Sequence, residues 1–167
     1  IWDLPFMAKR HAGVEIFCPF ESVSVVNSLI QHTVEPNLPP GVQYRPEMMP
    51  FKLHGVKPGE RFYIQEMGNA GAIIEVFECF HTAPCRGYGV NLMKKRLAEK
   101  LKGKSGAEIA QLRAAGEEVD EIVEEPAFAY LGDTSCEVYE TQPSLFKYPV
   151  IICECTFLPI GQVTAQQ

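Results

Sequence analysis

The sequence lacks any apolar run of about 18 residues, so we expect no transmembrane helix. It also lacks a Gly-x-Gly-x-x-Gly segment, a Gly-x-Ser-x-Gly elbow, a His-Glu-x-x-His motif and an Asn-x-Ser/Thr site. Because these motifs are absent, the sequence carries none of the usual signatures of dinucleotide-binding proteins, serine hydrolases or zincin proteases. The triplet Gly103-Lys104-Ser105 imitates the end of a phosphate-binding loop, but Ala98 stands where that loop needs its first glycine. Residues 1–7 carry neither a basic leader nor a signal-peptide core.

The chain is also short of positive charge, with a formal net charge of −6 over 167 residues. The surface as a whole therefore cannot attract nucleic acid, and any such contact must come from a local basic patch. The densest patch is the segment 94–104, which carries Lys94, Lys95, Arg96, Lys100, Lys102 and Lys104. Apolar residues make up 46% of the sequence, enough for a core, so residues 1–167 are expected to form a single domain.

The six cysteines lie mostly in apolar, strand-like stretches. A chain of this size does not need disulfides, so we expect free thiols in a reduced, intracellular protein. An alternative is a structural zinc site made by Cys79, His81 and Cys85 together with Cys153-Glu-Cys155. The Cys-x-Cys spacing is tighter than such sites usually have, and alternate residues of one strand begin a tetrahedron poorly.

Hydrophobic periodicity and turn residues predict many short strands and few helices. Strands are expected over 14–18, 42–45, 51–54, 61–66, 72–80, 88–93, 127–132 and 149–157. Helices are expected over 22–34, over 105–116 after the capping box Ser105-Gly-Ala-Glu108, and near 136–139. The first part reads as a β meander with one helix and the second as β-α-β. This mixture favours a layered α/β sandwich.

His81 and Asp133 each follow the end of an apolar strand, 72–80 and 127–132 respectively. Hydrolytic α/β proteins assemble metal ligands from distant parts of the sequence in this way. A short, rigid aspartate suits a position that bridges two cations about 3.5–4 Å apart, and Gly132 allows the backbone to approach closely. The alternatives are a hydrogen-bonded structural histidine and a turn aspartate.

Four segments resemble, in order, segments of the ribonuclease Z family of the metallo-β-lactamase superfamily. They are Val14–Pro19 with the helix after it, Phe80-His81-Thr-Ala-Pro-Cys-Arg-Gly87-Tyr88, Leu131-Gly-Asp-Thr134, and Ile151-Ile-Cys-Glu-Cys-Thr-Phe157. The second is similar to the family's metal-binding His followed by Gly-Tyr, and the third to its Gly-Asp-Thr. The last is similar to a strand that usually reads Leu-Ile-His-Glu-Ala-Thr-Phe.

The resemblance implies an α/β, metallo-β-lactamase-like four-layer αββα sandwich, of which this chain is an incomplete part. It implies an endonuclease that cuts the 3′ ends of precursor tRNA with two zinc ions, manganese being the alternative metal. His81 and Asp133 would be metal ligands, with Asp133 bridging and catalytic. Cys153 and Glu154 would lie beneath the site. The resemblance also implies a homodimer, for which the sequence identifies no interface.

Three departures from the family pattern affect these expectations. The first metal motif, His-x-His-x-Asp-His, is absent, and so is the family's final metal-binding His, which predicts a fragment lacking both ends of the domain. Two ligands cannot hold a metal pair, and His11, His32 and His54 are not convincing additions. We therefore expect this chain alone to bind catalytic metal poorly and to be inactive. Finally, Cys153 replaces the family His implicated in proton transfer, and a thiol replaces imidazole poorly near neutral pH.

Two other functions stay open for the full-length protein. One is a catalytically degenerate scaffold or RNA-binding protein, and the other is a hydrolase of the same superfamily that acts on small phosphodiesters. For the tRNA-processing enzyme, Lys94, Lys95, Arg96 and Lys100 are the candidate contacts to RNA phosphates. The alternative is that these cations form an ordinary solvated face.

Overall fold

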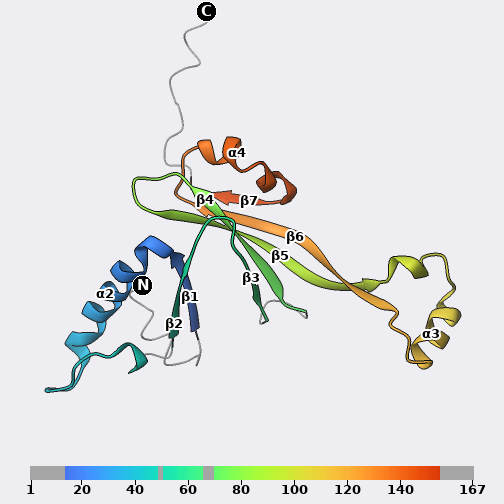
Figure 1. Cartoon of the computed structure of the whole chain (residues 1–167), viewed down its shortest axis with the longest axis horizontal. Helices are drawn as coiled ribbons and strands as arrows, with labels where there is room; N and C mark the ends of the chain where they lie inside the picture. The colour runs from blue at the N-terminus through green and yellow to red at the C-terminus, as the bar shows by residue number, and fades with distance from the viewer. Residues whose placement is uncertain (1–13, 49–50, 66–69, 155–167) are drawn as a thin grey trace, which may run out of the picture.

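The computed structural model describes residues 14–48, 51–65 and 70–154. Its larger sheet has five strands in the order β3-β4-β5-β6-β7 (Figure 1). They are β3 (Arg61–Ile64), β4 (Ala72–Cys79), β5 (Cys85–Leu97), β6 (Asp120–Gly132) and β7 (Ile151–Cys153). Neighbouring strands are antiparallel except β6 and β7, which are parallel. A parallel pair needs a crossover, and α4 (Glu137–Thr141) lies in this one.

A second sheet pairs β1 (Val14–Pro19) with β2 (Phe51–Val56) in parallel, and α2 (Val23–Val34) belongs to the connection. The Phe17 ring stacks on the Phe62 ring of the larger sheet, with centroids 4.3 Å apart. The Tyr88 hydroxyl also donates a hydrogen bond to the Phe17 carbonyl oxygen at 3.4 Å. These contacts hold the small sheet against the large one.

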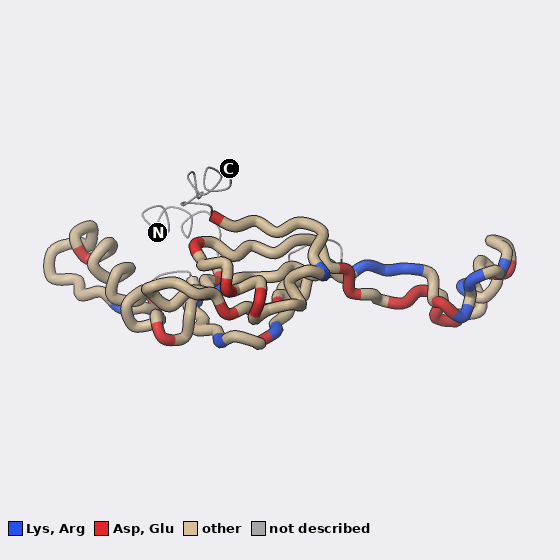
Figure 2. The backbone as a smooth tube through the Cα atoms, turned by 90° about the horizontal axis from the view of Figure 1, so that it is seen from above, with Lys and Arg blue, Asp and Glu red and all other residues tan. Residues whose placement is uncertain are grey.

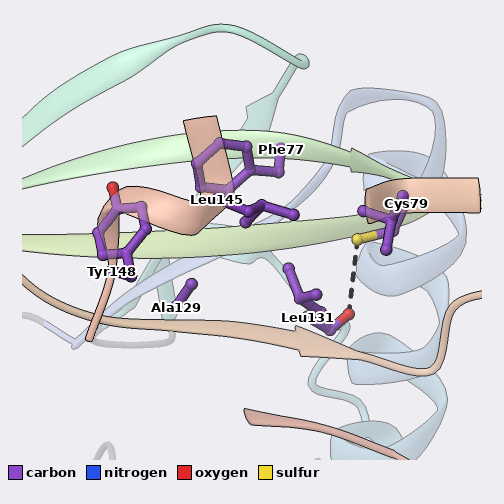
Figure 3. Packing of buried hydrophobic residues seen from close by; sticks show 7 residues of the cluster. Phe77, Cys79, Ala129, Leu131, Leu145 and Tyr148 are labelled. Carbon is purple, nitrogen blue, oxygen red and sulfur yellow. Dashed lines mark hydrogen bonds between the residues drawn. The ribbon is translucent and has the colours of Figure 1, made fainter. Parts of the chain in front are cut away.

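The main core lies on one face of the larger sheet, between β4, β6 and the β6–β7 connection (Figure 3). Its buried residues are Phe77, Cys79, Ala129, Leu131, Val138, Leu145 and Tyr148. The Phe77 and Tyr148 rings meet edge to face, with centroids 6.0 Å apart. Burying an aliphatic side chain such as Leu131 or Leu145 stabilises a fold by about 1.5–3 kcal/mol. This cluster therefore anchors the ends of β4 and β6, the two strands that His81 and Asp133 follow.

The β5–β6 hairpin continues beyond the sheet as an arm, residues 94–123, that carries α3 (Gly106–Ala114) at its far end (Figure 1). The pairing of β4 with β5 ends at Ala72↔Leu92, whereas β5 and β6 stay paired as far as Leu97↔Asp120. Figure 2 shows a basic run along one strand of the arm opposite an acidic run along the other. A small apolar cluster of Ala98, Leu101 and Val119 closes the tip.

Most of the predicted elements are confirmed, including the hairpin that joins β3 to β4. The capping box of α3 is also present, because the Ser105 hydroxyl accepts the Glu108 backbone N–H while the Glu108 carboxylate accepts the Ser105 N–H. The last strand, predicted over 149–157, is β7, and the part from Cys155 onward lies outside the described residues.

Three predictions about the elements were wrong. Residues 42–45 form no strand; prolines at 39, 40 and 46 flank this segment, and proline cannot donate to a ladder. The β meander predicted for the first part is confined to β3, β4 and β5, because β1 and β2 form a separate parallel pair. The third error concerns the arm, where the basic segment from Lys94 continues β5 and the acidic stretch from Asp120 belongs to β6.

Candidate functional site

His81 and Asp133 meet at one edge of the larger sheet, as their positions after two strands predict. His81 lies in the loop between β4 and β5, and Asp133 directly follows β6. The His81 Nε2 atom is 3.0 Å from Asp133 Oδ2, and both side chains are exposed. Gly132 has φ +65°, a left-handed conformation that turns the chain directly before the carboxylate. The structure thus brings the two side chains into contact, whereas their roles as metal ligands stay predictions.

Backbone and hydroxyl contacts connect the loop of His81 to the segment after Asp133. The Phe80 N–H donates to Thr134 Oγ1 at 2.9 Å, and the Ser135 N–H donates to the Phe80 carbonyl oxygen at 2.9 Å. The Ala83 N–H reaches His81 Nδ1 at 3.4 Å, so Nδ1 acts as an acceptor and the ring proton is placed on Nε2. In this tautomer, Nε2–H donates to the Asp133 carboxylate.

Two thiols lie directly behind this pair. The Cys79 Sγ–H donates to the Leu131 carbonyl oxygen at 3.6 Å (Figure 3), and the Cys85 thiol reaches the Asp133 carbonyl oxygen at 3.3 Å. Burial, followed by the nearby Cys85 thiol, raises the pKa of Cys79 to about 12. Cys79 is therefore a neutral thiol near neutral pH.

Cys153 and Glu154 stand beside Asp133 through the parallel pairing of β6 and β7. Cys153 pairs with Gly132 in the register, and the Glu154 N–H donates to the Gly132 carbonyl oxygen at 2.9 Å. The Tyr139 hydroxyl donates to Cys153 Sγ at 3.3 Å. Both Cys153 and Glu154 are exposed, which places them next to the predicted site, rather than in a packed layer beneath it.

The four candidate RNA-binding cations differ in their surroundings. The Lys94 ammonium lies 2.8 Å from Glu125 Oε1, and Arg96 pairs with the other oxygen of the same carboxylate. The hydrogen bond from Lys94, with the charge of Arg96 added, holds the pKa of Glu125 below its usual value. Within the described ranges, no ion pair involves Lys95 or Lys100. Lys95 lines an open hollow together with Arg113 and Glu117.

Two features of this region escaped prediction from the sequence. Glu125 neutralises part of the basic segment, and the signal for it was the acidic stretch 117–125, which follows the basic segment in the sequence and opposes it in charge. The other is the opposition of Cys79 and Cys85 across the β4–β5 hairpin, which follows from the turn at residues 80–84. Both depend on how two strands are paired.

The described residues alone do not fit a complete zinc centre. A zinc ion in a protein takes three or four nitrogen, oxygen or sulfur ligands. Across residues 14–48, 51–65 and 70–154, no three His, Cys, Asp or Glu side chains come together in a way that could hold a metal ion. The alternative structural zinc site of Cys79, His81, Cys85 and Cys153 is likewise not assembled, and Cys155 lies outside these ranges. His81 and Asp133 supply two donors.

The structure thus defines a mixed α/β protein with an imidazole and a carboxylate paired at a sheet edge and a two-stranded arm leading away from it. No protein-family model matches the chain. The chain is 30% identical over 136 residues to tRNase Z TRZ1 of Arabidopsis thaliana, an alignment that covers 80% of this chain and 47% of that protein. It is 28% identical over 89 residues to the chloroplastic tRNase Z TRZ2 of the same plant, covering 52% of this chain and 25% of that protein.

These matches support an assignment to the ribonuclease Z family, the tRNase Z group, matched over part of its relatives' length. The chain spans about half the length of the first of these relatives. The mixed α/β architecture is compatible with an incomplete metallo-β-lactamase-like fold, as the resemblance implied. Among the described residues, no helix has the length and apolar character needed to cross a membrane.

Proposed function

We propose that this chain supplies part of the active site of a ribonuclease Z-like, metal-dependent phosphodiesterase that acts on the 3′ ends of precursor tRNA. The observation that carries the proposal is the 3.0 Å approach of His81 Nε2 to Asp133 Oδ2. The pair occurs in a chain whose relatives are tRNase Z proteins. An imidazole nitrogen and a carboxylate are ligands that zinc accepts, and manganese accepts the carboxylate as readily.

In this proposal His81 and Asp133 are two of the ligands, and their neighbours hold them in position. The Thr134 hydroxyl fixes the loop of His81 by accepting the Phe80 N–H. Gly132, in its left-handed conformation, turns the chain directly before Asp133. For His81 Nε2 to bind a metal, its proton must move to Nδ1 or leave the ring, so binding competes with the hydrogen bond to Asp133.

The proposal is tested on the full-length protein with 3′-extended precursor tRNA, in the presence of zinc or of manganese. Asp133→Asn and His81→Asn should each lower the cleavage rate at least about a hundredfold, because metal-site residues typically have effects of that size or larger. His32→Asn is the matched control: His32 is exposed on α2, and its Nδ1 atom contacts the Ser28 carbonyl oxygen of the same helix at 2.7 Å. Full cleavage by both site variants would contradict the proposal.

A specific observation also supports a catalytically degenerate, RNA-binding protein. Cys153 stands where the family has a histidine, and its sulfur already accepts the Tyr139 hydroxyl. A thiol in this position cannot pass a proton near neutral pH as imidazole does. Cys153→His in the full-length protein separates the two functions. A gain in cleavage supports a slowed enzyme, whereas RNA binding without cleavage in both forms supports the degenerate protein.

A bis-aryl phosphate substrate separates tRNA processing from general phosphodiester hydrolysis. If the protein hydrolyses small phosphodiesters and leaves precursor tRNA intact, the tRNA-processing part of the proposal fails while the metal site stands. Variants of the arm discriminate further. The two strands of the arm lead away from His81 and Asp133. Substitutions in the arm should therefore leave hydrolysis of the small substrate unchanged.

A further inference from the structure

Cys79 and Cys85 face one another at the closed end of the β4–β5 hairpin. They are directly opposed in the antiparallel register, with the loop 80–84 between them. The Cα atoms of opposed residues in such a ladder lie about 4.5–5.5 Å apart, a separation that a disulfide spans without movement of the backbone. Opposed side chains also project from the same face of the sheet.

The sulfur positions agree with this register. Both thiols approach the same acceptor, the Leu131 carbonyl oxygen, from Cys79 Sγ at 3.6 Å and from Cys85 Sγ at 4.0 Å. Gly87 adds room on this face, since a Cβ atom there would lie 3.1 Å from Cys79 Sγ. The two sulfur atoms therefore lie on the same side of the hairpin, next to the Leu131 carbonyl oxygen.

We propose that Cys79 and Cys85 form an intramolecular disulfide when the protein meets a peroxide, which makes the end of this hairpin a site of reversible oxidation. Cys85 is the more exposed of the two and reacts first. Its sulfur attacks one oxygen of hydrogen peroxide, giving a sulfenic acid and one water. The Cys79 sulfur then attacks the Cys85 sulfur and gives up its proton to the departing hydroxyl, so that the S–S bond forms and a second water leaves. Two thiols lose two electrons and peroxide gains them.

The bond would act on the loop that carries His81. A disulfide closes a ring of residues 79–85 around this loop and removes both S–H donors from the carbonyl oxygens of Leu131 and Asp133. The segment containing Asp133 thus loses hydrogen bonds at the same moment as the His81 loop is constrained. Oxidation should therefore change the approach of His81 to Asp133.

The test uses the 167-residue chain, reduced and then freed of reductant under native conditions. The chain is treated with about one equivalent of hydrogen peroxide, alkylated with iodoacetamide and mapped by mass spectrometry after proteolysis. We expect a Cys79–Cys85 linked peptide, a loss of two free thiols, and full recovery of both thiols with dithiothreitol. Cys136 and Cys153, which are exposed, should remain available to iodoacetamide.

Two variants sharpen this result. Cys85→Ser should abolish the linked peptide and leave Cys79 reduced, whereas Cys136→Ser should form the link as the parent does. A link from Cys85 to any other cysteine, or sulfinic acid at Cys85 without a link, would overturn the proposal. The parent protein alone decides this, so poor folding of a variant does not blur the answer.

Coupling to the site is measured separately, by histidine ring resonances in the NMR spectrum. Oxidation should shift the His81 ring signals and leave those of His32 in place, and dithiothreitol should restore them. Formation of the disulfide with unchanged His81 signals would refute the coupling. This readout needs neither metal nor RNA, so its failure is distinct from a failure of the proposed enzyme.

Discussion

The Asn91 side chain donates a hydrogen bond from Nδ2 to the Tyr148 hydroxyl oxygen at 3.0 Å, in the buried centre of the larger sheet. Both residues are almost fully buried, at 0% and 4% exposure. Nδ2 also reaches the Ile73 carbonyl oxygen, and the Tyr148 hydroxyl donates to Glu75 at 3.4 Å. Burial, the largest cause, raises the pKa of Tyr148 to about 12, so the hydroxyl stays protonated and acts as both donor and acceptor.

Removal of this hydroxyl should destabilise the protein. Tyr148→Phe leaves the buried Asn91 amide with one acceptor in place of two, and an unsatisfied buried group costs about 1–3 kcal/mol. We expect a fall of that size in the free energy of unfolding, measured with urea. Tyr130→Phe is the matched control, since Tyr130 is 52% exposed, and it should change stability by less than about 0.5 kcal/mol. Equal effects of the two substitutions would contradict a special role for the buried hydroxyl.

Gly89 leaves the space into which this hydroxyl fits. A Cβ atom at position 89 would lie 2.2 Å from the Tyr148 hydroxyl and 2.8 Å from Phe77 Cε2. Gly89→Ala should therefore lower the free energy of unfolding by about 1–3 kcal/mol, as overpacking of a core does. The control is Gly106→Ala at the start of α3, where an added Cβ meets no atom within 4 Å. Thermal unfolding of both variants checks the contrast, and an undisturbed Gly89→Ala protein would show that the core can rearrange.

The first turn of α3 should loosen in acid. The Ser105 hydroxyl and backbone N–H both donate to the Glu108 carboxylate at 2.7 Å, and they hold its pKa below the ordinary value of 4.5. A lowered folded-state pKa means that the capping interaction is fully present above pH 4.5 and is lost as the pH falls through the folded-state pKa. Amide exchange of residues 106–110, followed by NMR, measures this loss.

Glu108→Gln is the matched variant for that experiment, because glutamine keeps a capping side chain and does not titrate. Its exchange rates, corrected for the intrinsic effect of pH, should stay constant over the range in which the parent loosens. The same acid response in both proteins would assign the loosening to another group.

RNA binding by the arm should depend more on Lys95 and Lys100 than on Lys94 and Arg96. The latter two are engaged by Glu125, whereas among the described residues the former have no ion-pair partner. If both free lysines contact phosphates, Lys95→Gln with Lys100→Gln should flatten the salt dependence of binding by about 0.7–0.9 log units per contact. Lys94→Gln with Arg96→Gln should flatten it less.

Filter binding of precursor tRNA over a range of salt concentrations measures both slopes. Each double variant removes two positive charges, so the comparison is matched in net charge. An unchanged salt dependence in both double variants would mean that the basic segment is a solvated face that contacts no phosphates. The ion pair of Lys94 with Glu125 already neutralises part of its charge.

Local sequence patterns were enough to place His81 and Asp133 at one sheet edge. An apolar strand that ends in a turn delivers the next polar side chain to the rim of its sheet, whichever strands become its neighbours. The capping box at Ser105 is equally local, since its hydrogen bonds join residues three positions apart. Such features are decided within a few residues and are therefore readable before the fold is known.

Only the tertiary structure decided how far β5 and β6 extend. Lys94, Lys95 and Arg96 have no apolar alternation, so nothing local marks them as a strand; they become one because β6 supplies backbone partners and opposite charges across the ladder. The same register, set over long separations in sequence, turned four equivalent cations into two paired with Glu125 and two without an ion-pair partner among the described residues. Pairing across such separations depends on contacts between distant segments, which no short window of sequence contains.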